Sequence, residues 1–527
     1  MTVELLERRF REDYQGQFRA DIDGEMGALY LLLAYDFYAQ QSVPTEVVDI
    51  LKFHLMHALR WGRNATSQPL TSSPAQTDPD LFNKFWEVLR YANGYTGAYG
   101  AFRLFEKGVI TIESISDQSI TFNGNPAWEA YNELDRQIQE RPHPNDHRSK
   151  TIATVNHIVE NVLTYFTFPD YFPNINDFCN ALPEMQHLAE EGFELPDSWD
   201  FDGVPIAILR QFWTALMLWG MVHNAVSHRR FGCHNPNLHH LVIRRKDRLI
   251  GWLADCLTLD KAILARLIDL HIYDRQHNLP DIALPPLLAL SDDLLAFSPW
   301  LVLTSRFERN FAAFVARNYK AQYDAATDGL APLMAAQIAE AFREAGFKAK
   351  LSVPIRTSKG DGDIDLLVWS PEERYVLGIE LKWVIGVADV MEVLNRGEST
   401  CSASIKKQIP KYCEALSQSV GVLLQRAFSL GEVPSIDGWS CALMTRGFIG
   451  SPRIVNGQCL FIAEQFALEK LASRCSLRDF CDWARVMPYL PVEGREFRMT
   501  PVSTTSPSGL TVTYWERDRI KAEAEGK

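Results

Sequence analysis

The sequence predicts a multidomain protein, in which a mainly α-helical N-terminal region precedes a smaller α/β domain with a central mixed sheet flanked by helices. The chain has 527 residues, enough for two or three domains, and 46% of them are hydrophobic, as in globular proteins with large cores. Apolar residues recur every three or four positions through most of the first three hundred residues, which is the period of a buried helix face. Short runs rich in β-branched and aromatic residues gather between residues 347 and 446, and these are typical of strands.

The helical region is predicted from five segments with this period, namely residues 27–40, 47–62, 81–95, 208–228 and 300–319. Segments dense in Pro, Ser, Asn or Asp separate them, at residues 64–80, 139–150 and 195–205. We see no repeat of fixed period. We therefore assign residues 1–315 to a helical region, which can divide into two subdomains near residues 140–150.

A β-hairpin is predicted where two strand-like runs, residues 364–369 and 375–383, flank a short stretch of turn residues. Asp365 lies on the first strand, and Glu380 and Lys382 lie two apart on the second. Because side chains alternate across a strand, Glu380 and Lys382 share one face. The hairpin can therefore bring one carboxylate beside a second carboxylate and a lysine.

Charged side chains on a buried strand need a partner, solvent or a bound cation. Two convergent carboxylates form a hard oxygen site suited to Mg²⁺ or Mn²⁺, which keeps several waters and binds phosphate oxygens as well. A lysine beside them can orient the attacking water or neutralise charge that develops on the phosphate. These residue types are the ones that phosphodiester hydrolysis requires.

At these positions the chain resembles the PD-(D/E)xK nuclease superfamily, which has the restriction-endonuclease-like fold. Asp365 matches the first acidic residue, and Glu380, Leu381 and Lys382 match the E-x-K element. Downstream, Gln408 and Tyr412 stand four apart on a predicted helix, as in the Q-x-x-x-Y signature of the RecB-like branch. The resemblance covers the C-terminal part of the chain, and the N-terminal region resembles no family that we can name.

The resemblance implies a role for each matched residue. Asp365 and Glu380 are expected to hold Mg²⁺ or Mn²⁺, and Lys382 to assist the water. Gln408 and Tyr412 are expected to position the substrate or the lysine. The first helix of these nucleases usually carries a glutamate that faces the metal, so Glu340 is a further candidate metal ligand.

The elements around the hairpin occur in the order that the superfamily requires. A helix is predicted at residues 330–345 before Gly346, then a strand at residues 347–355, the hairpin, a helix at residues 404–418 and a strand at residues 438–446. These elements define a nuclease-like domain at residues 325–466. Residues 467–527 are predicted to form a C-terminal extension with a helix and a β-hairpin.

The net charge of −13 argues against a protein that coats nucleic acid in general, so the local distribution of charge matters more. Basic residues gather in sequence around the hairpin and are predicted to bind the phosphates of a nucleic acid, DNA ahead of RNA. They are Lys348, Lys350, Lys359, Lys406, Lys407 and Lys411. A second basic run lies at residues 244–248, where a simple solvated face is the alternative.

Two other functional hypotheses remain open. The nuclease fold can be a catalytically inactive module that binds nucleic acid or supports assembly. Alternatively, residues 223–228 resemble the R-N-x-x-x-H signature of HEPN ribonucleases, with His228 as the catalytic histidine and His223 in place of the arginine. Residues 223–240 also contain five histidines and one cysteine, but their spacing is not that of a zinc site.

The remaining features favour a cytoplasmic protein without a membrane segment. The first residues are charged from the fourth position onward, unlike a secretory signal, and no apolar run reaches the ~18–20 residues of a membrane helix. The nine cysteines form no C-x-x-C pair and are expected to be reduced. A large helical region joined to one nuclease module resembles the architecture of bacterial defence effectors, so the helices are expected to sense a signal, bind a partner protein or form a homo-oligomer.

Overall fold

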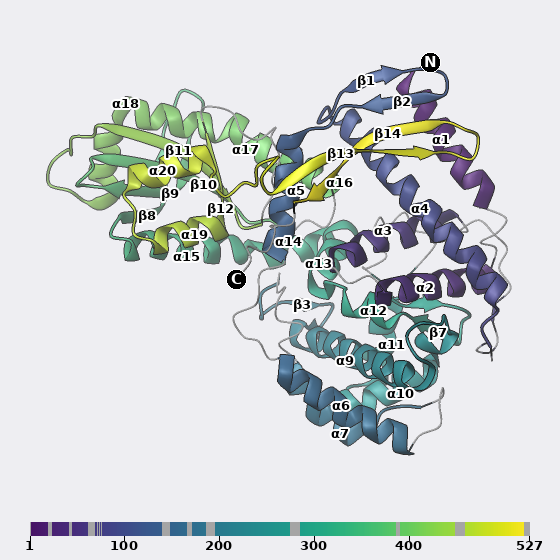
Figure 1. Cartoon of the computed structure of the whole chain (residues 1–527). Coiled ribbons are helices and arrows are strands. Elements are labelled where there is room, and N and C mark those ends of the chain that lie inside the picture. The colour runs from purple at the N-terminus through teal and green to yellow at the C-terminus, as the bar shows by residue number, and fades with distance from the viewer. Residues whose placement is uncertain are drawn as a thin grey trace, which may run out of the picture.

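A computed structural model describes most of the chain. The described residues are 2–18, 24–41, 45–61, 69–70, 72, 74, 76–139, 148–165, 171–185, 195–273, 285–385, 390–447 and 459–520. The protein is a multidomain α/β protein with extensive helix and several sheets (Figure 1). Within the described residues, no helix is long and apolar enough to cross a membrane.

The largest sheet has five strands and lies in the C-terminal half. The strands are β8 (Lys348–Ile355), β9 (Gly362–Ser370), β10 (Tyr375–Lys382), β11 (Gly438–Thr445) and β12 (Leu460–Ala463). Their order across the sheet is β12-β11-β10-β9-β8, so the first three strands of the chain form a meander at one side. Strands β8, β9 and β10 pair antiparallel, whereas β11 runs parallel to both β10 and β12. The sheet is therefore mixed, as the sequence predicts.

Helices cover both faces of this sheet. Helix α18 (Ile409–Phe428) lies on one face, and α15 (Leu330–Glu344), α19 (Glu464–Ala472) and α20 (Leu477–Val486) pack on the other (Figure 1). Strand alternation separates the two cores: Leu377 and Ile379 contact the α15 side, and Val376 contacts the α18 side. A cluster of buried side chains thus fixes α18 against the sheet face that bears the even-numbered residues of β10.

The connection from β10 to α18 is a run of short helices. It contains α16 (Val390–Arg396), a π-helical turn at Gly397–Cys401 and α17 (Ser402–Lys407). The helix is interrupted at Gln408, between α17 and α18. Pro410 lies in the first turn of α18, where its missing N–H removes no helical hydrogen bond. The single helix predicted over residues 404–418 is thus two helices.

The N-terminal region is mainly helical, as expected from its apolar period, and its described residues pack around two hydrophobic cores. The first is built by α1 (Val3–Phe18), α2 (Gly24–Gln41), α3 (Thr45–Trp61) and α4 (Pro79–Glu106), with α5 (Pro126–Gln139) beside it. The second is built by α6 (Arg148–Tyr165), α7 (Ile175–Met185), α9 (Ile206–Phe231), α10 (Lys246–Leu257), α11 (Lys261–Leu270), α12 (Pro299–Leu303) and α13 (Phe307–Asn318), and α14 (Lys320–Asp328) leads on to α15.

Small sheets in this region were not expected from the sequence. Strands β1 (Ile112–Ile115) and β2 (Ser119–Phe122) join the C-terminal hairpin of β13 (Phe497–Thr505) and β14 (Thr511–Arg519) in one sheet. Strand β14 runs parallel to β2, so the hairpin of β13 and β14 lies against the first core (Figure 1). Two further sheets combine β3 (Asp200–Phe201) with β4 (Val204–Pro205), and β5 (Val242–Arg245) with β7 (Leu294–Phe297) and β6 (Leu288–Ala289).

The segment that follows β10 is anchored in the helical region. Ile385 is part of the second helical core and Leu394 of the first. The carboxylate of Glu392 pairs with Arg309 and, at 3.0 Å, with Arg317, both on α13. Since Arg309 is 3% exposed and Glu392 13%, this ion pair is largely withdrawn from water.

Replacing Glu392 by Ala should destabilise the protein by about 3 kcal/mol, because it leaves the buried guanidinium of Arg309 without this carboxylate. Glu398→Ala is the matched control, because the Glu398 carboxylate is 49% exposed in its ion pair with Lys107 and should cost less than about 1 kcal/mol. Equilibrium unfolding in urea measures both values. Equal effects of the two substitutions would contradict a buried ion pair between the segment after β10 and helix α13.

Candidate active site

Asp365 and Glu380 occupy the point where strands β9 and β10 separate. The antiparallel pairing of these strands ends at Ile379 and Leu366, so Glu380 and Asp365 are the next residues on each strand. The Asp365 carboxylate accepts a hydrogen bond from the backbone N–H of Leu381 at 2.8 Å. The N–H of Leu381 thus bonds a side-chain oxygen of Asp365 instead of a backbone carbonyl of β9. This hydrogen bond keeps the Asp365 carboxylate next to Glu380, the residue before Leu381.

Glu380 is the centre of the arrangement and is 2% exposed. One carboxylate oxygen lies 2.6 Å from the ammonium nitrogen of Lys382. The other accepts a hydrogen bond from the hydroxyl of Tyr412 at 2.5 Å. The same hydroxyl oxygen accepts the backbone N–H of Asp365 at 3.2 Å. Four residues predicted from three separate sequence patterns are therefore linked by direct contacts.

Burial and the nearby charge of Glu380 change how Asp365 titrates. Burial raises the pKa of Asp365 to about 6, and the charge of Glu380 acts in the same direction, against the opposing effects of the Leu381 N–H and Lys382. Burial and the same two carboxylates raise the pKa of Tyr412 as well, so its phenol remains protonated and can donate to Glu380. With both carboxylates ionised, one lysine leaves a net negative charge at this site.

The donor set suits a hard divalent cation. It offers carboxylate oxygens from two strands, and Mg²⁺ commonly takes one or two carboxylates, several waters and a substrate phosphate. Among the described residues, no group of three or more His, Cys, Asp or Glu side chains could hold a metal ion. A cation at Asp365 and Glu380 would therefore depend on water and substrate oxygens for its other ligands.

Gln408 and Glu340 are not brought to the carboxylates in the same way. Gln408 precedes α18, and its backbone carbonyl accepts the N–H groups of Lys411 and Tyr412, so it supports the turn that carries the tyrosine. Glu340 lies on α15, on the opposite face of the sheet from α18, and pairs with Arg343 at 2.8 Å. The glutamate is 59% exposed.

The predicted phosphate-binding lysines lie on the edge strand β8, on the loop after it and around the junction of α17 and α18. Lys348 and Lys350 are exposed on β8, and the ammonium of Lys348 lies 5.0 Å from the ring centre of Trp369. Lys406 and Lys407 are exposed at the end of α17. Lys411 donates to the backbone carbonyl of Asp361 at 3.0 Å.

Two contacts that the sequence does not reveal fasten the loop between β8 and β9 to α18. Glu414 accepts hydrogen bonds from the backbone N–H of Ser358 at 2.5 Å and from its hydroxyl at 2.9 Å. The Ser358 N–H contributes most to lowering the pKa of Glu414. Together with Lys411, Glu414 holds this loop beside the helix that carries Tyr412.

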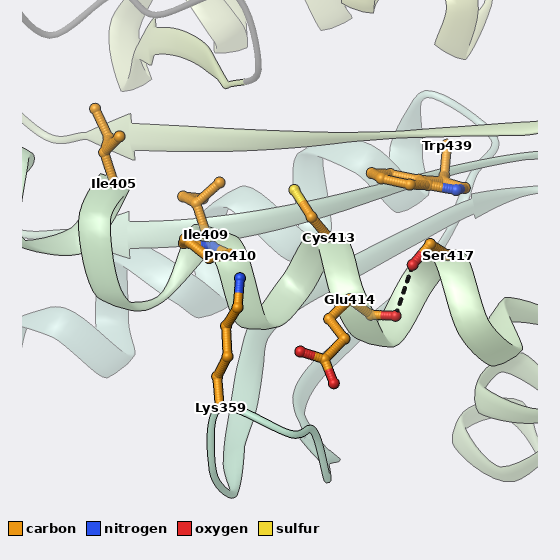
Figure 2. Close-up of a pocket in the computed structure, with 8 residues that line it drawn as sticks. All are labelled: Lys359, Ile405, Ile409, Pro410, Cys413, Glu414, Ser417 and Trp439. Atoms are coloured by element: carbon orange, nitrogen blue, oxygen red, sulfur yellow. Dashed lines mark hydrogen bonds between the residues drawn. The ribbon is translucent and has the colours of Figure 1, made fainter.

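A pocket of about 390 Å³ opens next to this loop (Figure 2). Its lining residues are Lys359, Ile405, Ile409, Pro410, Cys413, Glu414, Ser417 and Trp439. No motif in the sequence pointed to it. Of the predicted site residues, only Lys359 belongs to its lining.

The histidines of residues 223–240 contact other groups of the helical region. His223 is fully buried, with its ring nitrogens 3.0 Å from the Tyr171 hydroxyl and 3.0 Å from the His239 carbonyl oxygen. His240 lies 3.1 Å from the hydroxyl of Ser227, and burial lowers the pKa of His228. The half-buried ring of His228 packs edge-on against the ring of His240, and among the described residues these histidines belong to no group that could hold a metal ion.

The second basic run is also engaged within the protein. Arg244 is 5% exposed and donates to the Tyr171 carbonyl oxygen at 2.9 Å. Arg245 pairs with Asp247 at 3.1 Å, and Lys246 pairs with Asp269. The run therefore contributes one buried hydrogen-bonding arginine and two ion pairs nearer the surface.

Comparisons of the chain with protein-family models, with curated proteins and with solved structures returned no match.

Replacing Asp365 by Asn should stabilise the metal-free protein at pH 8 by about 1–3 kcal/mol. The native carboxyl, with a pKa near 6, keeps its proton where the unfolded carboxyl, at 3.8, has lost it, so its contribution to stability falls as pH rises between these values. Below pH 4 the substitution should change stability little. Thermal unfolding in EDTA at pH 4 and pH 8 measures the difference.

Asp363→Asn, at an exposed position on the same strand, is the control for the loss of one carboxylate from β9. A stabilising effect of Asp365→Asn that is equal at both pH values would contradict the close approach of two carboxylates.

Proposed function

We propose that the chain is a metal-dependent nuclease with a restriction-endonuclease-like domain at residues 325–466. The observation that carries the proposal is the convergence of Asp365, Glu380, Lys382 and Tyr412, which come from a D…E-x-K pattern and a Q-x-x-x-Y pattern. The order of elements supports it: a helix, a three-strand antiparallel meander, a helix and a strand parallel to the third. This is the order that the resemblance implies.

Asp365 and Glu380 would hold Mg²⁺ or Mn²⁺ between β9 and β10. When bound, the cation supplies a Lewis acid for the phosphate and a more acidic water. The residues of the chain prepare the site for it: Leu381 N–H and Tyr412 orient the two carboxylates, so that both keep fixed positions without the metal.

Lys382 is placed to act on the phosphate or on the attacking water. Its side chain is 33% exposed, whereas the Glu380 side chain to which it pairs is 3% exposed. The ammonium can therefore turn from Glu380 to an incoming anion at the surface, where it can neutralise charge that develops on the phosphate. Tyr412 stays with Glu380 and keeps that carboxylate oriented.

DNA is the substrate that we propose first, with RNA as the second. The exposed lysines of β8 and α17 would contact phosphates, and the overall negative charge would limit binding elsewhere on the surface. The helical region, linked to the segment after β10 through Ile385, Leu394 and Glu392, would serve a sensing or assembly role in a cytoplasmic bacterial defence effector, as a homo-oligomer or with a partner protein.

A catalytically inactive scaffold is the second candidate. The observation that favours it is that Asp365 and Glu380 have no third acidic, histidine or cysteine side chain in metal-binding reach among the described residues. In a scaffold, the pair of Lys382 with Glu380 would be a permanent structural contact. The experiment below distinguishes the two, because a scaffold binds nucleic acid without cleaving it.

Lys382→Ala and Asp365→Asn should each lower Mg²⁺-dependent cleavage of DNA by about 10²-fold or more, because each removes a group aimed at the reacting phosphate or its cation. Cleavage of linear and circular DNA, and of RNA, is followed on gels with Mg²⁺, Mn²⁺ or EDTA. His228→Ala should cleave like the wild type, because this half-buried ring packs against His240 in the helical region. Cleavage that persists in EDTA, or is lost in His228→Ala, would contradict the assignment.

Reversing Lys406 and Lys407 to Glu should weaken DNA binding and flatten its salt dependence. Each lost phosphate contact should lower the slope of log affinity against log salt by roughly 0.7–0.9. Binding is measured by fluorescence anisotropy on a Lys382→Ala background, which prevents cleavage. Arg245→Glu in the second basic run is the control, and an unchanged slope in the double lysine variant would place the phosphate path elsewhere.

A further inference from the structure

Two cysteines of different elements face one another beside Tyr412. Cys413, the next residue on α18, lies with its sulfur 3.5 Å from the sulfur of Cys441 on β11. Cys441 is 2% exposed, whereas Cys413 is half-buried and lines the pocket described above. One thiol is therefore open to a small solute, and the other lies directly behind it.

The fold explains why these two side chains meet. Ile405, Ile409, Cys413 and Ser417 repeat every four residues along the helical run, so they share the face that lines the pocket (Figure 2). On β11, Trp439 lines the same pocket, and Cys441 lies two residues further on the same side of the strand. The thiol pair thus forms where this helix face meets this strand face.

The surroundings make the two thiols unequal. The hydrogen bond between the two thiols is the main cause that lowers the pKa of Cys413 to about 7, and the charge of Lys359 acts in the same direction. The same hydrogen bond, together with burial, raises the pKa of Cys441. Cys413 is therefore the thiol that ionises near neutral pH, and Cys441 remains protonated beside it.

We propose that Cys413 and Cys441 form a peroxide-sensitive thiol pair that closes to a reversible disulfide. The Cys413 thiolate attacks a hydroperoxide such as hydrogen peroxide, forming an S–O bond and releasing hydroxide as the O–O bond breaks. The Cys441 sulfur then attacks the sulfenic sulfur, forming the S–S bond and releasing water. Two thiols are oxidised by two electrons, and one peroxide is reduced to two waters. A dithiol reverses the reaction by exchange.

Closure of the pair acts on the candidate active site. A disulfide has an S–S distance of about 2.05 Å, so the two sulfurs must approach by roughly 1.5 Å. Tyr412 precedes Cys413 on the same turn of α18, and its hydroxyl donates to Glu380 at 2.5 Å. A shift of this turn would therefore move the hydroxyl relative to Glu380. Formation of the disulfide does not depend on the proposed function, whereas its effect on catalysis does.

The test treats the full-length protein with stoichiometric hydrogen peroxide, blocks free thiols with iodoacetamide and maps linked peptides by mass spectrometry without reduction. We expect a linked Cys413–Cys441 peptide that dithiothreitol removes. In Cys441→Ser, Cys413 should instead be trapped as the sulfenic acid by dimedone. Cys179→Ser is the matched control, because Cys179 is comparably exposed but bonds the Cys256 carbonyl oxygen, and it should leave the linkage unchanged.

Before oxidation, Cys413 should react with iodoacetamide at pH 7 about five- to ten-fold faster than Cys475, a comparably exposed thiol whose pKa is raised by burial, since the larger thiolate fraction of Cys413 outweighs its lower intrinsic nucleophilicity. A Cys413 that stays reduced in peroxide, or that links to Cys459, would overturn the proposal. Cleavage assays on oxidised and reduced protein separate the two ideas: a mapped disulfide in a protein that cleaves nothing supports the thiol pair and rejects the proposed nuclease.

Discussion

The buried carboxylate of Glu380 is the constraint on which the arrangement of this domain depends. A carboxylate that is 2% exposed must be neutralised or hydrogen-bonded, and here Lys382 and Tyr412 each occupy one of its oxygens. Tyr412 can reach it because α18 packs on that face of the sheet, and Lys382 because it lies two residues along the same strand. The opening between β9 and β10, the position of α18 and the charge of the site all follow from satisfying this one group.

Asp365 adds a second charge to a place that already contains one. Its carboxylate takes the N–H of Leu381, so it contributes to the sheet as well as to the site. Burial first and the charge of Glu380 next raise the pKa of Asp365 to about 6, so the charged form of Asp365 is disfavoured at this place. A divalent cation would remove that conflict. The unfavourable charging of Asp365 beside Glu380 is therefore an electrostatic argument for a cation site, and it arises from the residues of the protein themselves.

Local patterns in the sequence predicted much of this domain, because strand alternation and helix period are local properties. Alternation placed Glu380 and Lys382 on one face, and the Q-x-x-x-Y pattern identified Tyr412, which the packing of α18 brings to Glu380, but it also predicted a site role for the Gln408 side chain that no contact shows. Pro410 is a local signal for the interruption at Gln408, whereas the π-helical turn at Gly397–Cys401 and the contacts of Glu414 with Ser358 depend on tertiary packing and leave no local signal. The pairing of β14 with β2 joins residues almost 400 positions apart, and the burial of Arg244 reverses what a charge run suggests.

The most direct test of the central claim is the binding of Mn²⁺ to the purified full-length chain, followed by electron paramagnetic resonance of the free ion. The account predicts that the wild type binds Mn²⁺ at a site that Asp365→Asn and Glu380→Gln each abolish, whereas Glu340→Gln, on the opposite face of the sheet, binds as the wild type does. Binding that survives both Asp365→Asn and Glu380→Gln, or a wild type that binds no Mn²⁺ with or without DNA, would contradict it.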